Sequence, residues 1–125
     1  MSLDLTVLIV DDQDTNFDYF RVVLTRSYNT ILRGLNGTDA IEKMRLNPEI
    51  GLVLMDCNMP EMNGLDATRE IRKFNQTVPI IMITAYAHEI SRQVAVTAGC
   101  NDYMVKPVSP KDLLNIVEKY VEHNQ

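Results

Sequence analysis

Two patterns of hydrophobic residues alternate along the chain. Short uninterrupted apolar runs that end in charged or turn-forming residues are typical of strands buried on both faces. Between these runs, apolar residues recur every three or four positions, which is typical of helices with one buried face. The predicted strands span residues 6–10, 28–32, 51–56, 78–83 and 102–105, and the predicted helices span residues 14–27, 38–47, 64–74, 88–98 and 110–121.

Local signals mark several helix ends. Thr38 is a candidate N-cap for the second helix, and Gly99 can end the fourth helix in a left-handed conformation. Ser109 is the predicted N-cap of the last helix, with Pro110 at its first position and Asp112 three residues after the cap. These signals support the assignment of the second, fourth and last helices.

The strict alternation of strands and helices predicts an α/β fold. Its core is one doubly wound parallel sheet of five strands, covered by helices on both faces and joined by right-handed crossovers. For 125 residues the most economical strand order is 2-1-3-4-5, the flavodoxin-like order, with a switch point between the first and third strands. No internal repeat or linker interrupts the pattern, so we expect one domain over residues 1–125.

This topology predicts a site at one edge of the sheet. The carboxyl ends of the first, third, fourth and fifth strands lie side by side in the 2-1-3-4-5 order. In sequence order these ends carry Asp11 and Asp12, then Asp56, then Thr84 and finally Lys106. We therefore expect three acids, a hydroxyl and an ammonium group to gather there.

The chemistry of such a group follows from its charges. Three neighbouring carboxylates raise one another's pKa unless a cation intervenes, and oxygen ligands of this kind suit Mg²⁺. With Lys106 as a second positive charge, Asp56 is suited to attack a phosphorus atom, and Thr84 can hydrogen-bond the arriving phosphoryl group. Ala85 leaves room for in-line attack. The pattern thus indicates phosphoryl transfer to a carboxylate.

Composition narrows the setting. The net charge of −5 argues against direct binding to nucleic acid or to an anionic membrane. No apolar run has the length of a membrane span, and the first residues lack the pattern of a signal peptide. Cys57 and Cys100 form neither a disulfide framework nor a metal-ligand set, so we interpret them as buried thiols of a cytoplasmic protein.

Four segments together resemble the receiver domains of two-component response regulators. They are Val7–Asp12, Leu54–Gly64, Ile83–Ala85 and Lys106–Pro107, and the resemblance extends over essentially the whole chain. A single segment of this kind would be weak support, but all four in this order and spacing are specific. The stretch from Leu54 to Arg72 is similar to receivers attached to hybrid sensor histidine kinases.

The resemblance implies roles for the residues at the sheet edge. Asp56 would receive a phosphoryl group from a histidine of a partner kinase or of a histidine phosphotransfer protein. Mg²⁺ would be held by Asp11, Asp12, Asp56 and the backbone carbonyl of Asn58. Lys106 would pair first with Asp56 and then with the phosphoryl group, and the bond to the following proline would be cis.

The resemblance also implies how the signal is read. Thr84 would move toward the phosphoryl group, and Tyr103 would turn inward. The surface of the fourth helix, last strand and last helix would then bind partners, and a second copy of the chain is one candidate partner. Asn58 and Tyr86 would tune the rate of phosphoryl loss. Such a domain assists its own phosphorylation and dephosphorylation and is not otherwise an enzyme.

The sequence is also compatible with other functions. The chain could be a flavodoxin-like binding module that is not phosphorylated, or an aspartate-nucleophile phosphatase. The phosphatases usually carry a second acid two residues after the nucleophile, where this chain has Asn58. Lys106 could be a solvated surface charge, and Tyr103 a half-buried strand residue. The parent protein could be a hybrid kinase, a free-standing regulator or a transcription factor.

Overall fold

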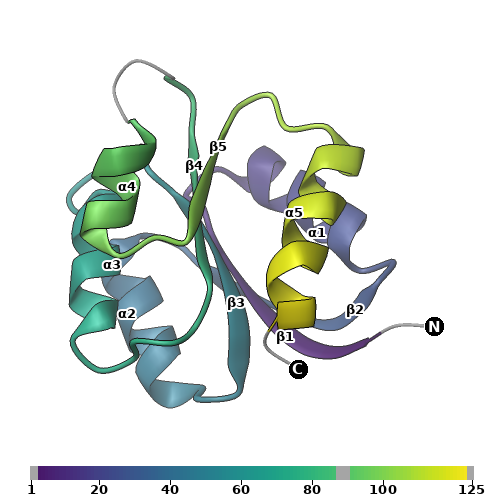
Figure 1. The fold of residues 1–125 in the computed structure, drawn as a ribbon, viewed down its shortest axis with the longest axis horizontal. Helices are drawn as coiled ribbons and strands as arrows, with labels where there is room; N and C mark the ends of the chain where they lie inside the picture. The colour runs from purple at the N-terminus through teal and green to yellow at the C-terminus, as the bar shows by residue number, and fades with distance from the viewer. Residues whose placement is uncertain (1–2, 87–90, 124–125) are drawn as a thin grey trace.

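The computed structural model describes residues 3–86 and 91–123, and within them five strands alternate with five helices (Figure 1). The fold class predicted from the sequence is therefore confirmed. In chain order the elements are β1 (Leu3–Val10), α1 (Asp14–Leu24), β2 (Tyr28–Gly34), α2 (Gly37–Leu46), β3 (Ile50–Asp56), α3 (Gly64–Arg72), β4 (Ile80–Thr84), α4 (Arg92–Ala98), β5 (Asp102–Val105) and α5 (Pro110–His123).

The strands form one sheet in the order β2-β1-β3-β4-β5, and every neighbouring pair is parallel. The predicted switch point is confirmed, because β1 pairs with both β2 and β3. The register places Val10 beside Met55, so β1 and β3 end next to each other. Thr84 is paired with Val105 at the ends of β4 and β5.

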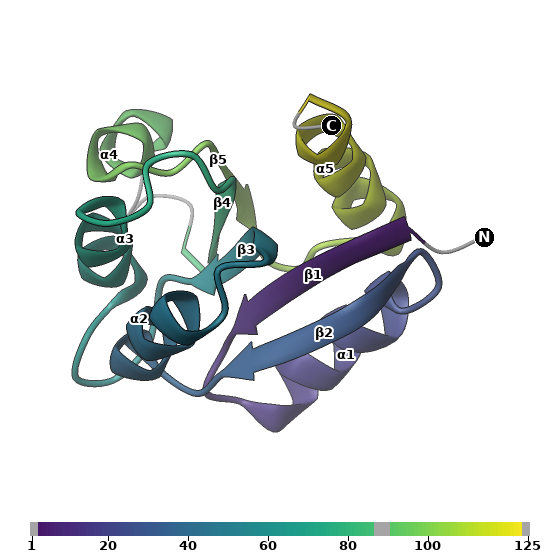
Figure 2. The same cartoon turned by 90° about the horizontal axis from the view of Figure 1, so that it is seen from below.

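Helices cover both faces of the sheet (Figure 2). Helices α1 and α5 lie on one face, and α2, α3 and α4 lie on the other. Successive residues of β1 point to opposite faces: Val7 and Ile9 pack under α1 and α5, whereas Leu8 and Val10 pack under the other three helices. This double burial explains why the strands read as uninterrupted apolar runs.

Two helix boundaries in the first half differ from the prediction. Helix α1 ends at Leu24 instead of near residue 27. Helix α2 is capped by Asn36 and not by Thr38, because the Asn36 side-chain oxygen accepts a hydrogen bond of 2.8 Å from the Asp39 N–H. Thr38 therefore lies inside the first turn. The asparagine that predicted a turn also supplies the cap.

Helix α4 is described from its N-cap Ser91 onward. The predicted start near His88 falls among residues 87–90, outside the described residues. The described helix begins at Arg92, where the Ser91 hydroxyl accepts a 3.2 Å hydrogen bond from Val94 N–H. At its other end Gly99 has φ +115°, as predicted for a left-handed cap. The capping of α5 by Ser109 is likewise confirmed, since its hydroxyl accepts from Asp112 N–H at 3.1 Å.

Candidate functional site

Backbone hydrogen bonds continue beyond the strand ends and position the predicted site residues. The amide of Asp11 donates to Gly34, the last residue of β2, at 3.0 Å. The amide of Lys106 donates to the carbonyl of Thr84 at 2.8 Å. The first residue after β1 and the first residue after β5 thus continue the backbone hydrogen bonding of the sheet. The structure brings Asp11, Asp12, Asp56, Thr84 and Lys106 to one edge of the sheet.

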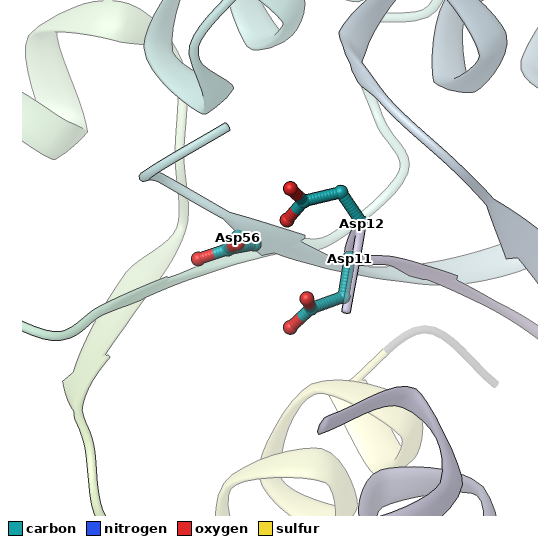
Figure 3. Close-up of side chains that lie close together, drawn as sticks. All are labelled: Asp11, Asp12 and Asp56. Atoms are coloured by element: carbon teal, nitrogen blue, oxygen red, sulfur yellow. The ribbon is translucent and has the colours of Figure 1, made fainter. Parts of the chain in front are cut away.

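Three carboxylates form a pocket at this edge (Figure 3). Asp11, Asp12 and Asp56 each offer an oxygen, and these oxygens all lie within 4.8 Å of one another. Asp11 and Asp56 are buried, with 1% and 4% of their surface exposed, while Asp12 is open to solvent. In Figure 3 the three side chains extend to the same side of the strand ends. Hard cations that keep part of their water shell suit such a half-open oxygen cluster.

The side chain of Asp11 shows where a cation fits. One carboxylate oxygen, Oδ1, accepts a 3.0 Å hydrogen bond from Gln13 N–H. The other, Oδ2, is buried and has no hydrogen-bond donor among the described residues; its cationic neighbour is Lys106, with Nζ 3.6 Å away. A buried charged oxygen without a donor is unfavourable unless an ion satisfies it. Asp11, Asp12 and Asp56 therefore fit a bound Mg²⁺.

Lys106 faces the pocket instead of the solvent. Its Nζ lies 3.4 Å from Oδ1 of Asp56, and its side chain is only 22% exposed. The same Asp56 oxygen accepts a 3.3 Å hydrogen bond from Asn58 N–H. Asp56 thus lies between the other two acids and a fixed ammonium group. The interpretation of Lys106 as a solvated surface charge is wrong.

The pKa of Asp56 is raised from 3.8 to about 6. Burial is the main cause, and the negative charge of Asp11 adds to it. Lys106 and the Asn58 N–H act in the opposite direction, but they do not fully offset the burial. A cation bound in this pocket would therefore lower the pKa of Asp56 and favour the ionised carboxylate, which is the nucleophilic form.

A second set of contacts joins the loops after β3 and β4. The buried Thr84 hydroxyl donates to the side-chain oxygen of Asn58 at 3.3 Å, and Ala85 N–H donates to the same oxygen at 3.3 Å. Tyr86 N–H in turn donates to the Thr84 hydroxyl at 3.1 Å. The exposed Asn58 side chain therefore bridges the two loops. Ala85 is exposed beside it, which leaves open space next to the pocket.

The loop between Asp56 and α3 is closed on itself. Gly64 N–H donates to the carbonyl of Cys57 at 3.1 Å. A Cβ atom at Gly64 would lie 2.5 Å from the Asp56 carbonyl oxygen and 3.0 Å from Cys57 Cα, so only glycine fits this close approach. Asn63 then caps α3 by accepting from Asp66 N–H at 2.9 Å. The end of β3 and the start of α3 are thereby fixed to each other.

Three further expectations meet the structure near the site. The Lys106–Pro107 bond is cis, as the resemblance implied. Cys57 and Cys100 are buried, as predicted. Tyr103 is half-buried and packs against the core under α2, α3 and α4. Its inward movement remains a prediction.

Two contacts were not identified from the sequence. The bridging side chain of Asn58 was missed because its position two residues after Asp56 suggested a metal ligand through the backbone. Arg33 was missed because it lies inside β2, where no motif marked it, yet its guanidinium hydrogen-bonds the carbonyl of Asp11. Neither contact has a signal in local sequence, since both partners come from different strands.

Among the described helices, none combines the length and apolar character needed to span a bilayer. This finding agrees with the sequence pattern, in which no apolar run was long enough for such a span.

Comparison with known proteins gives the same picture at the level of family. A family model for the response regulator receiver domain matches residues 7–118. Chemotaxis protein CheY1 of Helicobacter pylori is 37% identical over 117 residues, which are 91% of this chain and 94% of CheY1. The chain spans about half the length of other relatives, such as 48% of transcriptional regulatory protein SrrA of Staphylococcus aureus.

Two solved structures of similar fold contain magnesium. The receiver domain of a sensor histidine kinase from Pseudomonas aeruginosa, with magnesium coordinated in its active-site cleft, superposes with a TM-score of 0.86 at 30% identity, covering 96% of this chain and 99% of that one. CheY in a CheX–CheY–BeF3–Mg complex from Borrelia burgdorferi gives 0.87 at 28% identity, covering 92% and 87%. The three-acid pocket is typical of Mg²⁺-binding receivers. The chain therefore belongs to the response regulator receiver domain family, and its acidic pocket is the phosphoacceptor site of such a domain.

Proposed function

We propose that Asp56 accepts a phosphoryl group from a phosphohistidine of a partner kinase or histidine phosphotransfer protein. Mg²⁺ would be held by Asp11, Asp12, Asp56 and the backbone carbonyl of Asn58. The observation that carries this proposal is the position of Asp56. Its buried carboxylate lies between two further acids and Lys106 Nζ, 3.4 Å away. The positive charge of Lys106 beside Asp56 suits a carboxylate nucleophile that attacks a negatively charged phosphoryl group.

The transfer balances as a single displacement. An Asp56 carboxylate oxygen forms a bond to phosphorus while the bond from phosphorus to the partner's histidine nitrogen breaks. The nitrogen keeps the electron pair of that bond and takes up a proton, so the products are an aspartyl phosphate and a neutral imidazole. When bound, Mg²⁺ supplies positive charge that offsets the charge on the transferring oxygens.

The protein's own groups stabilise the arriving phosphoryl group. Lys106 offers a second positive charge, 3.4 Å from Asp56 and 3.6 Å from Asp11. The Thr84 hydroxyl and the Ala85 N–H are donors at the end of β4, and both bind Asn58. A phosphoryl oxygen would replace Asn58 as their acceptor. Because Ala85 has a small side chain and is exposed, the donor histidine can approach in line.

The signal would leave the site through α4, β5 and α5. Asp102, at the start of β5, is buried and binds both helices: Arg92 of α4 lies 2.8 Å away, and Tyr120 of α5 donates to it at 2.9 Å. Because Asp102 links α4, β5 and α5, a shift of Thr84 and Tyr103 would change the surface that these three elements form. We assign partner docking, including a possible homodimer, to this surface. The Borrelia CheY, a relative of this chain, is seen in complex with CheX.

The domain is proposed to act as a switch over residues 1–125, in the cytoplasm and without direct contact to nucleic acid or membrane. Its two buried cysteines, which form no disulfide framework in the sequence pattern, fit a reducing compartment. Its contribution to chemistry is to assist its own phosphorylation and dephosphorylation. The similarity both to CheY1 and to a receiver of a sensor histidine kinase supports a switch that serves as a free regulator or as a relay module.

The test uses a small phosphodonor. Wild-type protein is incubated with acetyl phosphate and MgCl₂, and its intact mass is measured before and after treatment with hydroxylamine. We expect one phosphoryl adduct that hydroxylamine removes, that EDTA prevents, and that Asp56→Asn lacks. Asp112→Asn, which changes an exposed acid in the first turn of α5, is the matched control and should be phosphorylated normally. A wild-type protein that gains no adduct would favour the unphosphorylated binding module.

A further inference from the structure

Arg33 reaches over the end of β1 from the neighbouring strand β2. Its Nε and Nη2 atoms donate to the carbonyl oxygen of Asp11 at 3.3 and 3.1 Å. Its Nη1 atom donates to Oδ1 of Asp14 at 2.7 Å. The guanidinium carbon lies 4.8 Å from the ring centre of Phe17, and the side chain is 22% exposed. One side chain therefore contacts the turn, the first residue of α1 and the first turn of that helix.

The contact with Asp11 fixes the geometry of the metal pocket. The Asp11 carbonyl belongs to the planar peptide group that leads into Asp12, so holding its oxygen restricts the direction in which Asp12 departs. The Asp11 amide is already bound to Gly34 of β2 at 3.0 Å. Both backbone polar groups of Asp11 are thus tied to β2. Gln13 N–H binds Oδ1, which leaves Oδ2 to face the pocket.

The helix itself supplies little of this restraint. Gln13 occupies the N-cap position of α1 and makes no side-chain capping bond. Beside this N-cap, Arg33 forms an ion pair with Asp14, the first residue of α1. A planar guanidinium can bind a carbonyl with two donors and a carboxylate with a third, whereas an ammonium group cannot present the same fork.

Considered as a charge alone, Arg33 should weaken Mg²⁺ binding. A guanidinium close to a Mg²⁺ site repels the ion, so removing it should strengthen Mg²⁺ binding. If the guanidinium instead holds the ligands in place, removing it should weaken binding. Groups that orient metal ligands typically change metal affinity about 10-fold to 100-fold when they are lost. The sign of the effect therefore separates the two explanations.

We propose that Arg33 is a positioning residue of the Mg²⁺ pocket, which holds the Asp11–Asp12 turn through the Asp11 carbonyl. This inference rests on the proposed function, because it takes Asp11 and Asp12 as Mg²⁺ ligands. It assigns a role in ion binding to a basic side chain of β2 that touches no ligand oxygen of the carboxylates.

The experiment measures the Kd for Mg²⁺ by titrating ¹⁵N-labelled protein with MgCl₂ and following the amide resonances of Asp12 and Gln13. Arg33→Gln should weaken binding about 10-fold. Arg33→Lys should weaken it nearly as much, because the charge is kept but the fork is lost. Arg21→Gln removes an equal charge from the exposed Arg21–Asp18 pair on α1 and should leave the Kd within about 2-fold of wild type.

A further variant isolates the carbonyl contact. Asp14→Asn breaks the 2.7 Å ion pair but leaves both bonds to the Asp11 carbonyl, so the Kd should stay within about 2-fold of wild type. An Asp14→Asn variant as weak as Arg33→Gln would overturn the proposal. Unchanged or tighter binding in Arg33→Gln would do the same and leave the proposed function intact. If Arg33→Gln does not fold, Arg33→Lys decides in the same way, since retained affinity overturns the role of the fork.

The same titration separates this inference from the proposed function. Wild-type protein should bind Mg²⁺ and Asp12→Asn should bind it more weakly. A wild-type protein without Mg²⁺-dependent shifts would overturn both proposals together. Urea unfolding of every variant in EDTA gives the stability of the metal-free protein, and a role in fold stability alone would lower that stability without changing the Kd of the folded protein.

Discussion

The side-chain oxygen of Asn58 accepts a hydrogen bond from the Thr84 hydroxyl at 3.3 Å, across the gap between the loops after β3 and β4. Ala85 N–H binds the same oxygen. In the proposed phosphoryl transfer these two donors would bind an oxygen of the phosphoryl group on Asp56. The proposal therefore predicts that Asn58 competes with that oxygen for both donors.

Asn58→Ala should raise the affinity for the phosphoryl mimic beryllium fluoride. The variant removes the competing acceptor but keeps the backbone carbonyl proposed to bind Mg²⁺. Losing the competition of one ordinary hydrogen bond corresponds to about 2-fold to 10-fold in affinity. A ¹⁹F NMR titration in MgCl₂ measures it, with Asn47→Ala, which changes a cap contact at the end of α2, as control. Weaker binding in Asn58→Ala would contradict the interpretation.

The raised pKa of Asp56 should make metal-free stability fall with rising pH. The carboxyl has a pKa of about 6 in the folded state against 3.8 in the unfolded chain, so between these values the folded state holds one more proton. The stability from this group is complete below pH 3.8 and is lost as pH rises through about 6. The loss amounts to about 3 kcal/mol.

Urea unfolding in EDTA at a series of pH values measures this dependence, and the difference between wild type and Asp56→Asn isolates the contribution of Asp56. Adding MgCl₂ should reduce the fall, since the ion binds the deprotonated carboxylates of the folded state. A difference between the two proteins that does not change between pH 4 and 7 would contradict the burial of an ionisable Asp56.

Lys106→Met should raise the pKa of Asp56 above its value of about 6. The ammonium group 3.4 Å away favours the ionised carboxylate, and the variant removes this attraction while burial and the charge of Asp11 remain. The ¹³C resonance of the Asp56 carboxyl carbon, followed against pH without Mg²⁺, gives the pKa directly. Lys43→Met, which removes the same charge from a pair with Asp39 on α2, should leave Asp56 unchanged.

Arg72→Met should destabilise the fold without affecting the site. The guanidinium donates to Gly99 O at 2.8 Å, to Asn75 O at 3.2 Å and to Asn101 Oδ1 at 3.0 Å, and so ties the end of α3 to the turn before β5. The loss of two partly buried hydrogen bonds and one exposed one should cost about 2–4 kcal/mol of the free energy of unfolding. Urea unfolding measures it.

The matched control for this prediction lies one turn earlier on the same helix. Arg69→Met removes an exposed pair with Asp66 and should cost less than about 1 kcal/mol. Both variants should keep the wild-type Kd for Mg²⁺. An equal loss of stability in the two variants would show that the contacts of Arg72 contribute no more than an exposed ion pair.

The fold and the gathering of the acids followed from the sequence because both depend on repeated patterns. Each buried strand is an apolar run, and a parallel sheet places the ends of such runs at one edge. The proximity of Asp11, Asp56 and Lys106 could therefore be predicted from the sequence. Helix starts were less predictable. Asn36 and Thr38 are both acceptable caps, and only the tertiary position of the turn decides between them.

The contacts between strands that are distant in sequence could not be predicted. Whether Arg33 points toward the Asp11 turn or toward solvent depends on the twist of the sheet and on the space beside Phe17, which no local pattern encodes. The same holds for Asn58, whose partners Thr84 and Ala85 come from another loop. The sequence predicted the residues at the strand ends but not the side-chain contacts that Arg33 and Asn58 make with neighbouring segments.

The hydrogen bond from Gly64 N–H to the Cys57 carbonyl, together with the lack of room for any Cβ at Gly64, sets the number of residues between Asp56 and α3. An added or deleted residue there would open the ring and rotate α3 relative to the end of β3. We therefore expect this segment to tolerate the exchange of one exposed side chain for another better than an insertion or a deletion.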